Sequence, residues 1–457
     1  MELAQALEPF EEMMRAEDLP EAAIRTFAHY YRKLHSGETG MIPEDSIEPV
    51  TDLPELADFR GKFREAGREA ASRTVMIKLN GGLGTSMGMQ KAKSLLPVRA
   101  EMRFIDIIAR HALAEGVPLI LMNSFATRED SLAALKGYPA LWDTAVGLDF
   151  VQHKFPKVLQ ADLSPAGSPD DPALSWNPPG HGDIYAALVS SGILDRLLDA
   201  GFEYVFVSNG DNLGAALDHD LLGYFAHHNL PFMMEVARRQ EAVAKGGHIA
   251  RRKGGGYVLR ETAQTPEEDR VHFQNPERHP YFNTNNLWVQ LPALQRQLDE
   301  HDQILGLPLI RNEKTLDPRD PESPKVYQLE TAMGAAIEVF DEAEAVGVTR
   351  DRFAPVKTTD DLLAVRSDAY ALTDDFRVVL QRDVPPEIDL DAEFYKLIDE
   401  FDGRFPQGSP SLIDCVRLRI RGDVAFGKDV VLRGNVEIEN PAGGQIVVPD
   451  GAVLRGD

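Results

Sequence analysis

The sequence predicts an α/β protein with a mostly parallel, helix-covered sheet and a C-terminal left-handed parallel β-helix. Short apolar runs at 74–79, 117–122, 204–208 and 231–236 are typical of buried strands. Helical patterns such as Phe104–Glu115 and Ile184–Leu198 lie between them. Strands that alternate with helices favour a parallel sheet, because each crossover connection is usually a helix. The last fifty residues instead repeat apolar side chains every six residues, which is typical of hexapeptide coils.

Two apolar series define the C-terminal repeat. They consist of Leu412, Leu418, Val424, Val430 and Val436, and of Ile420, Phe426, Leu432 and Ile438. Gly422, Gly427 and Gly434 are expected at the corners of the coils. An antiparallel meander is the alternative. Because the repeat is short, its coils are expected to pack on the main domain or on another subunit.

Three domains are expected along the chain. Residues 1–42 would form a helical appendage, 43–375 the main α/β domain, and 376–457 the β-helix domain. Within 1–35 two amphipathic helices are expected, the second beginning near Pro20. Residues 42–60 are rich in proline and acidic side chains, and they are expected to form an extended connection.

Composition excludes several classes of partner. The formal net charge is −25, which argues against nucleic acid and against anionic membrane surfaces as partners. Cys415 is the one cysteine, so an internal disulfide is impossible. The N-terminal segment lacks the pattern of a signal peptide, and the apolar runs are too short to span a bilayer. A cytoplasmic location is therefore expected.

A glycine-rich loop, Leu79–Gly88, directly follows the first strand of the main domain. Glycine lets backbone N–H groups approach phosphate closely. A dinucleotide-binding GxGxxG motif fails because Met87 occupies its last position, and a P-loop fails because Met89 and Gln90 follow Gly88. Lys91, Lys93 and Ser94 come next. The combination favours a nucleoside triphosphate site over a purely structural turn.

Other strands also end in candidate site residues. Asn209-Gly210-Asp211 follows the strand at 204–208, and a carboxylate there suits magnesium in a triphosphate enzyme, although it could be only a turn residue. Pro178–Asp183 precedes a helix, whose N-terminus favours anions, although such residues also suit any helix start. Ligands of parallel sheets bind beyond the carboxyl ends of the strands, so these loops are expected to converge.

The motif LNGGLGTSMG, followed by a Lys-Ser pair, resembles the signature of eukaryotic-type UDP-glucose pyrophosphorylases. Further matching stretches occur in the family's order across nearly the whole chain. They are PEDSIEP at 43–49, LMNSF at 121–125, PPGHGDIY at 178–185, VSNGDNLGA at 207–215, FNTNNLW at 282–288, QLETAMGAAI at 328–337 and FAPVKTTDDLL at 353–363. The resemblance implies a glycosyltransferase-A-like nucleotidyltransferase domain with a C-terminal β-helix.

The resemblance also implies roles for individual residues. Lys93 and Lys357 would be catalytic lysines beside the phosphates, and Asp211 would hold Mg²⁺. UTP would contact Leu79, Asn80, Gly81, Gly82, Gly84, Met122, Gln152 and Gly180. The sugar phosphate would contact His181, Asn209, Gly210, Glu261, Asn283 and Asn285. The family usually has Gly-Pro before the lysine where this chain has Lys91-Ala92, so Lys91 is a second candidate for the role of Lys93.

The implied reaction joins UTP and glucose 1-phosphate into UDP-glucose and pyrophosphate, reversibly. Two alternatives are a pyrophosphorylase for N-acetylhexosamine 1-phosphates or for several sugars, and a nucleotide-sugar sensor that has lost catalysis. Members of the family can associate through the β-helix, so a homo-oligomer is a possible assembly.

Overall fold

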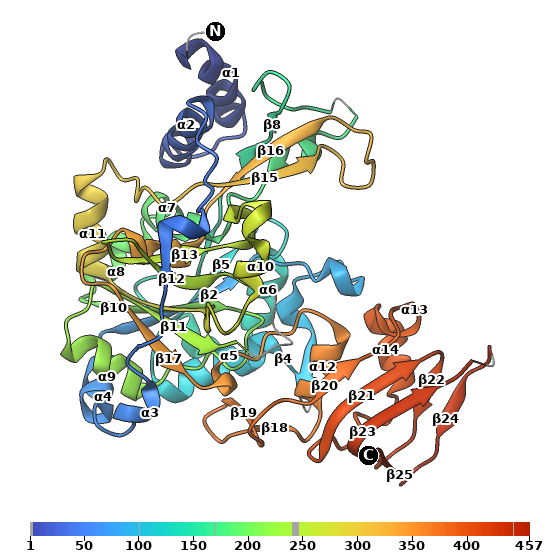
Figure 1. The fold of residues 1–457 in the computed structure, drawn as a ribbon. Coiled ribbons are helices and arrows are strands. Elements are labelled where there is room, and N and C mark those ends of the chain that lie inside the picture. The colour runs from blue at the N-terminus through green and yellow to red at the C-terminus, as the bar shows by residue number, and fades with distance from the viewer. Residues whose placement is uncertain (1–2, 100, 169, 240–245, 442) are drawn as a thin grey trace.

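The structure, a computed structural model, describes residues 3–99, 101–168, 170–239, 246–441 and 443–457. Its centre is a ten-stranded sheet in which β1, β12, β14, β10, β2, β5 and β6 are successive neighbours, while β11, β13 and β17 branch from this path (Figure 1). The strands are β1 (Ile47–Pro49), β2 (Thr74–Asn80), β5 (Leu119–Asn123), β6 (Asp149–Val151), β10 (Tyr204–Asn209), β11 (Phe232–Arg238), β12 (His248–Arg252), β13 (Tyr257–Arg260), β14 (Tyr281–Gln290) and β17 (Glu344–Val348).

Most strands of this sheet run in one direction, as predicted. β10, β2, β5 and β6 pair in parallel, and so do β11 and β17. The long strand β14 runs against β10, β11 and β12, and its register shifts between Glu235 and Val236 of β11. β1 adds to one edge of the sheet within the segment expected to be only a connection.

The sheet has an apolar cluster on each face. Val75 and Ile77 of β2 belong to one cluster, while Met76 between them belongs to the other. This alternation follows from the period of two along a strand, and it explains why the strands are apolar throughout. α7, α8 and α11 contribute to the first cluster, and α4, α5 and α9 to the second.

The α-helices have the following bounds: α1 Leu3–Ala16, α2 Glu21–His35, α3 Leu56–Phe59, α4 Arg64–Ala71, α5 Phe104–Glu115, α6 Arg128–Leu135, α7 Ile184–Ser190, α8 Ile193–Asp199, α9 His219–His227, α10 Arg270–Gln274, α11 Leu291–Glu300, α12 Thr359–Arg366, α13 Ala392–Tyr395 and α14 Ile398–Arg404. One prediction was wrong: the helix expected at Ile184–Leu198 is divided into α7 and α8. Gly192 lies between them at φ 68°, and this left-handed conformation ends the helical path.

The N-terminal helices pack on a small arm of the main domain. Their apolar faces join Phe155, Val158, Leu309 and Leu329 in one core. This arm is visible at the upper right of Figure 1. It contains β7 (Phe155–Pro156), β8 (Val158–Leu159), β9 (Trp176–Asn177), β15 (Ile310–Thr315) and β16 (Lys325–Glu330). Two antiparallel pairs lie outside the central sheet, β3 (Pro97–Arg99) with β4 (Met102–Arg103), and β18 (Tyr370–Leu372) with β19 (Val378–Leu380).

The C-terminal region forms two parallel sheets, which contradicts the antiparallel meander. One has the order β20, β21, β23, β25, and the other pairs β22 with β24. The strands are β20 (Glu387–Asp389), β21 (Cys415–Arg421), β22 (Val424–Phe426), β23 (Val431–Glu439), β24 (Ile446–Val448) and β25 (Val453–Arg455). The first hexad series, from Leu412 to Val436, is buried throughout.

The C-terminal core continues into the main domain. Its cluster includes Met87 of the glycine loop, Leu96 and Val98 after this loop, and Val356, which directly precedes Lys357. The positions of the glycine loop and of Lys357 therefore depend on the packing of this C-terminal core. The division of the chain at 42/43 and 375/376 stays a prediction. None of the helices in the described part of the chain combines the length and apolarity that crossing a bilayer requires.

Candidate active site

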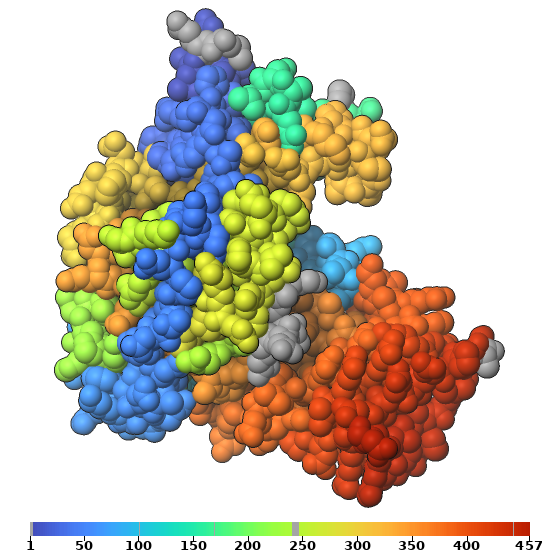
Figure 2. All heavy atoms as spheres, in the orientation of Figure 1, coloured from blue at the N-terminus to red at the C-terminus, as the bar shows by residue number. Residues whose placement is uncertain are grey.

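A cleft of about 340 Å³ lies at the carboxyl ends of β2, β5 and β10. The molecule is visibly hollowed between the β15–β16 arm and the C-terminal strands (Figure 2). The cleft is lined by Leu79, Asn80, Gly81, Gly82, Lys93, Ser94, Met122, Gln152, Pro178, Gly180, His181, Asn209, Gly210 and Asp211. Twelve of these fourteen residues were predicted from the sequence as site residues, and Ser94 and Pro178 were not among them.

The glycine loop is joined by backbone hydrogen bonds to the end of β10 and to Lys93. The Gly210 N–H donates to the Leu79 carbonyl at 2.8 Å, which joins the ends of β10 and β2. A Cβ on Gly210 would lie 2.9 Å from that same oxygen. Farther along, the Lys93 N–H donates to the Gly82 carbonyl at 3.0 Å, so the loop closes on the lysine. The loop backbone therefore forms one wall of the cleft.

Lys93 and Asp211 form an ion pair within the cleft. The Lys93 Nζ donates to Asp211 Oδ2 at 2.7 Å, and the two side chains are 14% and 26% exposed. The lysine follows β2 and the aspartate follows β10, and these strands are parallel neighbours. Their pairing brings together two residues that are 118 positions apart. The structure therefore brings these two residues together in one cleft.

The backbone just before Lys357 contacts the backbone of Asp211 and Asn212. The Val356 N–H donates to the Asp211 carbonyl at 3.0 Å, and Asn212 forms a β-bridge with Pro355. The Lys357 side chain is exposed, and its charge also acts on Glu261. Lys357 thus lies at the rim between Asp211 and Glu261, although it is not among the residues that line the cleft wall.

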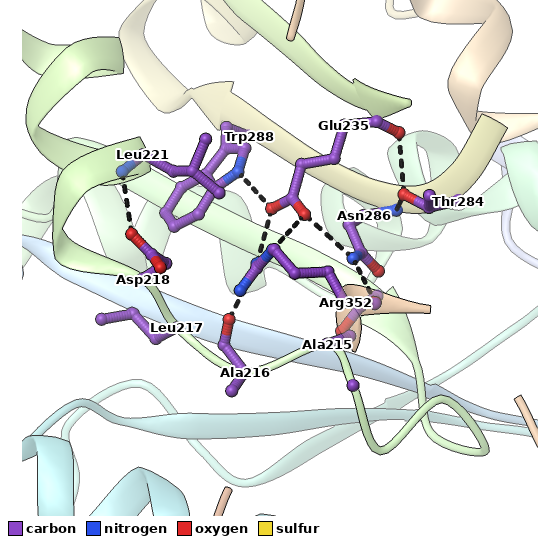
Figure 3. A network of polar contacts seen from close by, with 12 residues as sticks. Ala215, Ala216, Leu217, Asp218, Leu221, Glu235, Thr284, Asn286, Trp288 and Arg352 are labelled. Carbon is purple, nitrogen blue, oxygen red and sulfur yellow. Dashed lines mark hydrogen bonds and ion pairs between the residues drawn. The ribbon is translucent and has the colours of Figure 1, made fainter. Parts of the chain in front are cut away.

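A buried polar network around Glu235 and Arg352 contacts the loop that follows Asp211, through the Ala216 carbonyl (Figure 3). Asn212 donates from Nδ2 to Asn286 Oδ1 and to the Arg352 carbonyl, both at 3.2 Å. Arg352 in turn binds both carboxylate oxygens of Glu235, at 2.6 and 2.7 Å, and the Ala216 carbonyl at 2.9 Å. Burial lowers the pKa of Arg352, but the carboxylate of Glu235 outweighs this effect and raises the pKa overall.

Lys78 of β2 connects the same loop to this strand by hydrogen bonds. Its buried Nζ donates to Ser208 Oγ and to the Ala215 carbonyl, both at 2.6 Å. Burial, together with the charge of Arg352, lowers the pKa of Lys78 to about 7. A lysine inside an apolar strand gives no sequence signal for this contact, because its partners are 130 or more residues away.

Gln152 and Gly180, two predicted UTP contacts, both line the cleft. A Cβ on Gly81 would lie 3.0 Å from Gln152 Oε1, so the glutamine amide packs directly on the loop. Gly180 has φ 77°, and a Cβ there would lie 2.4 Å from the Thr331 carbonyl oxygen. Only glycine fits this position without moving the backbone.

His181 is held in one tautomer. The Met333 N–H donates to Nδ1 at 2.9 Å, so the ring proton of the neutral form lies on Nε2. Burial lowers the pKa of His181 to about 4. The ring therefore stays neutral at physiological pH and offers an N–H donor to a ligand.

Three further predicted sugar contacts, Glu261, Asn283 and Asn285, form a group around Gly247. Asn283 and Asn285 are joined by two hydrogen bonds of 2.8 Å, with Asn285 at φ 59° in the irregular part of β14. A Cβ on Gly247 would lie 2.6 Å from the Glu261 carboxylate, and the Gly247 carbonyl accepts from the Asn283 N–H. Burial raises the pKa of Glu261, an effect that Lys357 and the Gly247 N–H oppose.

The structure places three of the candidate site residues differently from what the sequence led us to expect. The Asn80 side chain donates from Nδ2 to Asn123 Oδ1 and to Ser131 Oγ, each at 2.7 Å, so this amide group is bonded within the protein. Gly84 lies outside the cleft lining, and a Cβ there would lie 3.4 Å from Lys93 Cγ. Lys91 is exposed and does not line the cleft, so the geometry favours Lys93 for the phosphate role.

Ser94 is a site residue that sequence reasoning did not select. It lines the cleft, and within the described part of the chain its buried Oγ has no hydrogen-bond partner. An unpaired buried hydroxyl is unfavourable unless a ligand or water completes its bonding. The sequence feature that could have identified Ser94 is the Lys-Ser pair that follows the glycine-rich motif.

The donor set at Asp211 fits magnesium bound mainly through substrate. Across the described ranges no three His, Cys, Asp or Glu side chains gather to hold a metal ion. Mg²⁺ is commonly bound by one or two carboxylates together with substrate phosphates. A single partly exposed carboxylate beside a glycine loop matches that pattern.

A parallel-strand cleft with a glycine loop, a lysine and a carboxylate defines a nucleotidyltransferase. The family profile described as UTP–glucose-1-phosphate uridylyltransferase matches residues 24–433. The chain belongs to this family. The enzyme of that name from Solanum tuberosum is 38% identical over 426 residues, covering 91% of this chain and 84% of the relative.

Solved structures agree with this assignment. A mutant of UDP-glucose pyrophosphorylase from Leishmania major, in complex with UDP-glucose, has 44% identity and a TM-score of 0.91, covering 99% of this chain and 98% of that one. UDP-glucose phosphorylase from Trypanosoma brucei has 46% identity and a TM-score of 0.88, covering 99% of each chain.

Proposed function

We propose that this protein transfers the uridylyl group of UTP to glucose 1-phosphate, giving UDP-glucose and pyrophosphate. The observation that carries the proposal is the convergence of the glycine loop, Lys93 and Asp211 in one cleft, with Lys357 at its rim. The family assignment and the complex of a relative with UDP-glucose support the choice of substrates.

In the proposed reaction a phosphate oxygen of glucose 1-phosphate attacks the α-phosphorus of UTP, and pyrophosphate leaves from the opposite side. The attacking oxygen is already anionic, so no general base is required. The main difficulty is the repulsion between two polyanions. Lys93, Lys357 and the loop N–H groups would reduce this repulsion and hold the two substrates in line. One phosphoanhydride replaces another, so the reaction should be reversible.

Mg²⁺ is the proposed cofactor, held by Asp211 together with the UTP phosphates. When bound, it would neutralise phosphate charge. Lys93, which pairs with Asp211 in the structure, would exchange this aspartate for phosphate as the substrates enter. This exchange lets each group keep a partner of opposite charge throughout the cycle.

One coupled assay tests the proposal against its alternatives. Pyrophosphate release is measured with UTP and Mg²⁺ across glucose, N-acetylglucosamine and galactose 1-phosphates. Preference for glucose 1-phosphate supports the proposal, whereas comparable rates with several sugars favour a broad pyrophosphorylase. UTP binding without any pyrophosphate release would point to a sensor and contradict the proposal.

Several finer features belong to the same proposal. The parallel C-terminal strands would wind as a left-handed β-helix, in keeping with the buried hexad series. A homo-oligomer and a cytoplasmic location also stay predictions. Size-exclusion chromatography with light scattering would determine the oligomeric state.

Replacing Asp211 by alanine is expected to raise the Mg²⁺ concentration for half-maximal activity by about tenfold or more, because the metal loses its protein ligand. The measurement is a Mg²⁺ titration of initial rate at saturating UTP. Asp199→Ala, on the exposed end of α8, is the matched control and should leave the titration unchanged. An unchanged titration for Asp211→Ala would remove this residue from the metal site.

A further inference from the structure

The carboxylate of Asp183 has an unusual partner for a residue at a helix start. Asp183 occupies the N-cap position of α7, yet its side chain makes no capping hydrogen bond to that helix. It accepts instead from the backbone N–H of His153 at 2.7 Å and contacts the His153 ring Nδ1 at 2.8 Å. Helix capping therefore does not explain this aspartate.

The His153 ring is clamped from both sides. His153 is 5% exposed and Asp183 3%, so the contact is shielded from water. An ionised carboxylate can only accept, and Nδ1 therefore carries a proton. On the other side of the ring, Nε2 lies 2.8 Å from Ser190 Oγ at the end of α7. One imidazole thus connects both ends of α7 to the loop after β6.

This clamp joins two segments that line the cleft. Gln152, which packs on the glycine loop, directly precedes His153. Gly180 and His181 also line the cleft, and they precede Asp183 by three and two residues. The position of Gln152 relative to Gly180 therefore depends on the contact between His153 and Asp183.

We propose that His153 and Asp183 are positioning residues that set the nucleobase selectivity of the site by fixing Gln152 against Gly180. The inference rests on the proposed function, since it takes uracil as the base bound there. Neither residue needs to touch the nucleotide.

The reason lies in the pattern of donors and acceptors on the two pyrimidines. Uracil presents an N–H between two carbonyl oxygens, whereas cytosine presents an acceptor nitrogen beside an amino group. A glutamine amide that turns over exchanges its donor and its acceptor, and so can pair with either base. Selectivity for uracil requires the amide and the Gly180 backbone to be held at a fixed separation. Sites that hold their polar groups in this way reject an analogue with the wrong pattern strongly.

The test compares UTP with CTP in three variants. His153→Leu removes the ring contacts, while His153→Asn keeps an N–H near the position of Nδ1. Asp106→Asn is the matched control, because Asp106 is also a buried aspartate that accepts a backbone N–H, that of Arg103 at 2.9 Å, but lies outside the cleft lining. The readout is the ratio of kcat/KM for UTP to that for CTP, which does not depend on the folded fraction of each preparation.

We expect His153→Leu to lower this ratio about tenfold, the scale of one lost hydrogen bond, mainly through a higher KM for UTP. His153→Asn should retain most of the selectivity, and Asp106→Asn should retain all of it. An unchanged ratio in His153→Leu, or a wild-type ratio near one, would overturn the inference. If the wild type fails to turn over UTP, the proposed function fails, and calorimetric affinities for UTP and CTP then give the same ratio independently of turnover.

Discussion

Replacing Lys93 by alanine is expected to lower kcat by about a hundredfold to a thousandfold, the range found when one group that stabilises transition-state charge is removed. Lys93 lines the cleft, where the glycine loop closes on its backbone and its Nζ contacts Asp211. Charge on the transferring phosphate grows as the reaction proceeds, so the lysine contributes more to the transition state than to the ground state. The KM for glucose 1-phosphate should change much less than kcat.

Lys91 supplies the matched control for this experiment. It is two residues away, carries the same charge and is exposed outside the cleft lining. Lys91→Ala should therefore leave kcat nearly unchanged. Steady-state kinetics with both substrates varied will distinguish the two lysines. Normal turnover in Lys93→Ala would exclude Lys93 from the mechanism, and a large loss in Lys91→Ala would assign the role to Lys91.

Replacing Glu235 by leucine is expected to lower the free energy of unfolding by about 3–5 kcal/mol, because the guanidinium of Arg352 is left buried without its counter-charge. Glu235 is fully buried and also accepts from Trp288 Nε1 at 2.9 Å and from Asn286 Nδ2 at 3.1 Å. This loss of stability should lower the urea concentration at the midpoint of unfolding.

Two further variants determine whether the buried charge is the cause. The double variant Glu235→Leu/Arg352→Met should recover part of the lost stability, since apolar residues can replace a buried ion pair. Glu313→Gln breaks a 3.3 Å pair with Arg311 at an exposed position, and it should change stability by less than about 1 kcal/mol. If Glu235→Leu costs no more than this control, the network does not stabilise the fold as described.

Local patterns in the sequence were sufficient for four strands of the central sheet and for the helices α1, α2 and α5. The apolar runs predicted β2, β5, β10 and β11, because buried parallel strands are apolar on both faces. The division between α7 and α8 was missed, since a single glycine inside a helical pattern is often tolerated. The antiparallel direction of β14 was not predicted either, because strand pairing depends on contacts far apart in the sequence.

Short motifs mark most residues that line the candidate cleft, whereas contacts between distant parts of the chain leave no mark in the sequence. Lys93 and Asp211 each follow an apolar strand beside glycine, and they meet because parallel neighbouring strands end at the same edge. The buried charged residues that hold the loop of Asp211 in place do not belong to such a motif. Lys78, Glu235 and Arg352 contact partners more than a hundred positions away, and their charges alone would suggest exposed residues.

The ion pair between Lys93 and Asp211 also affects how a nucleotide would approach the cleft. Each charge is already matched by the other before any ligand arrives, so the cleft presents only a weak attractive potential at long range. The chain as a whole carries a net charge of −25 and repels anions. Dissolved ions screen that repulsion over roughly 10 Å at 0.1 M. Moderate ionic strength should therefore speed the encounter with UTP, whereas it slows ligand capture by most phosphate-binding proteins that rely on a positive surface.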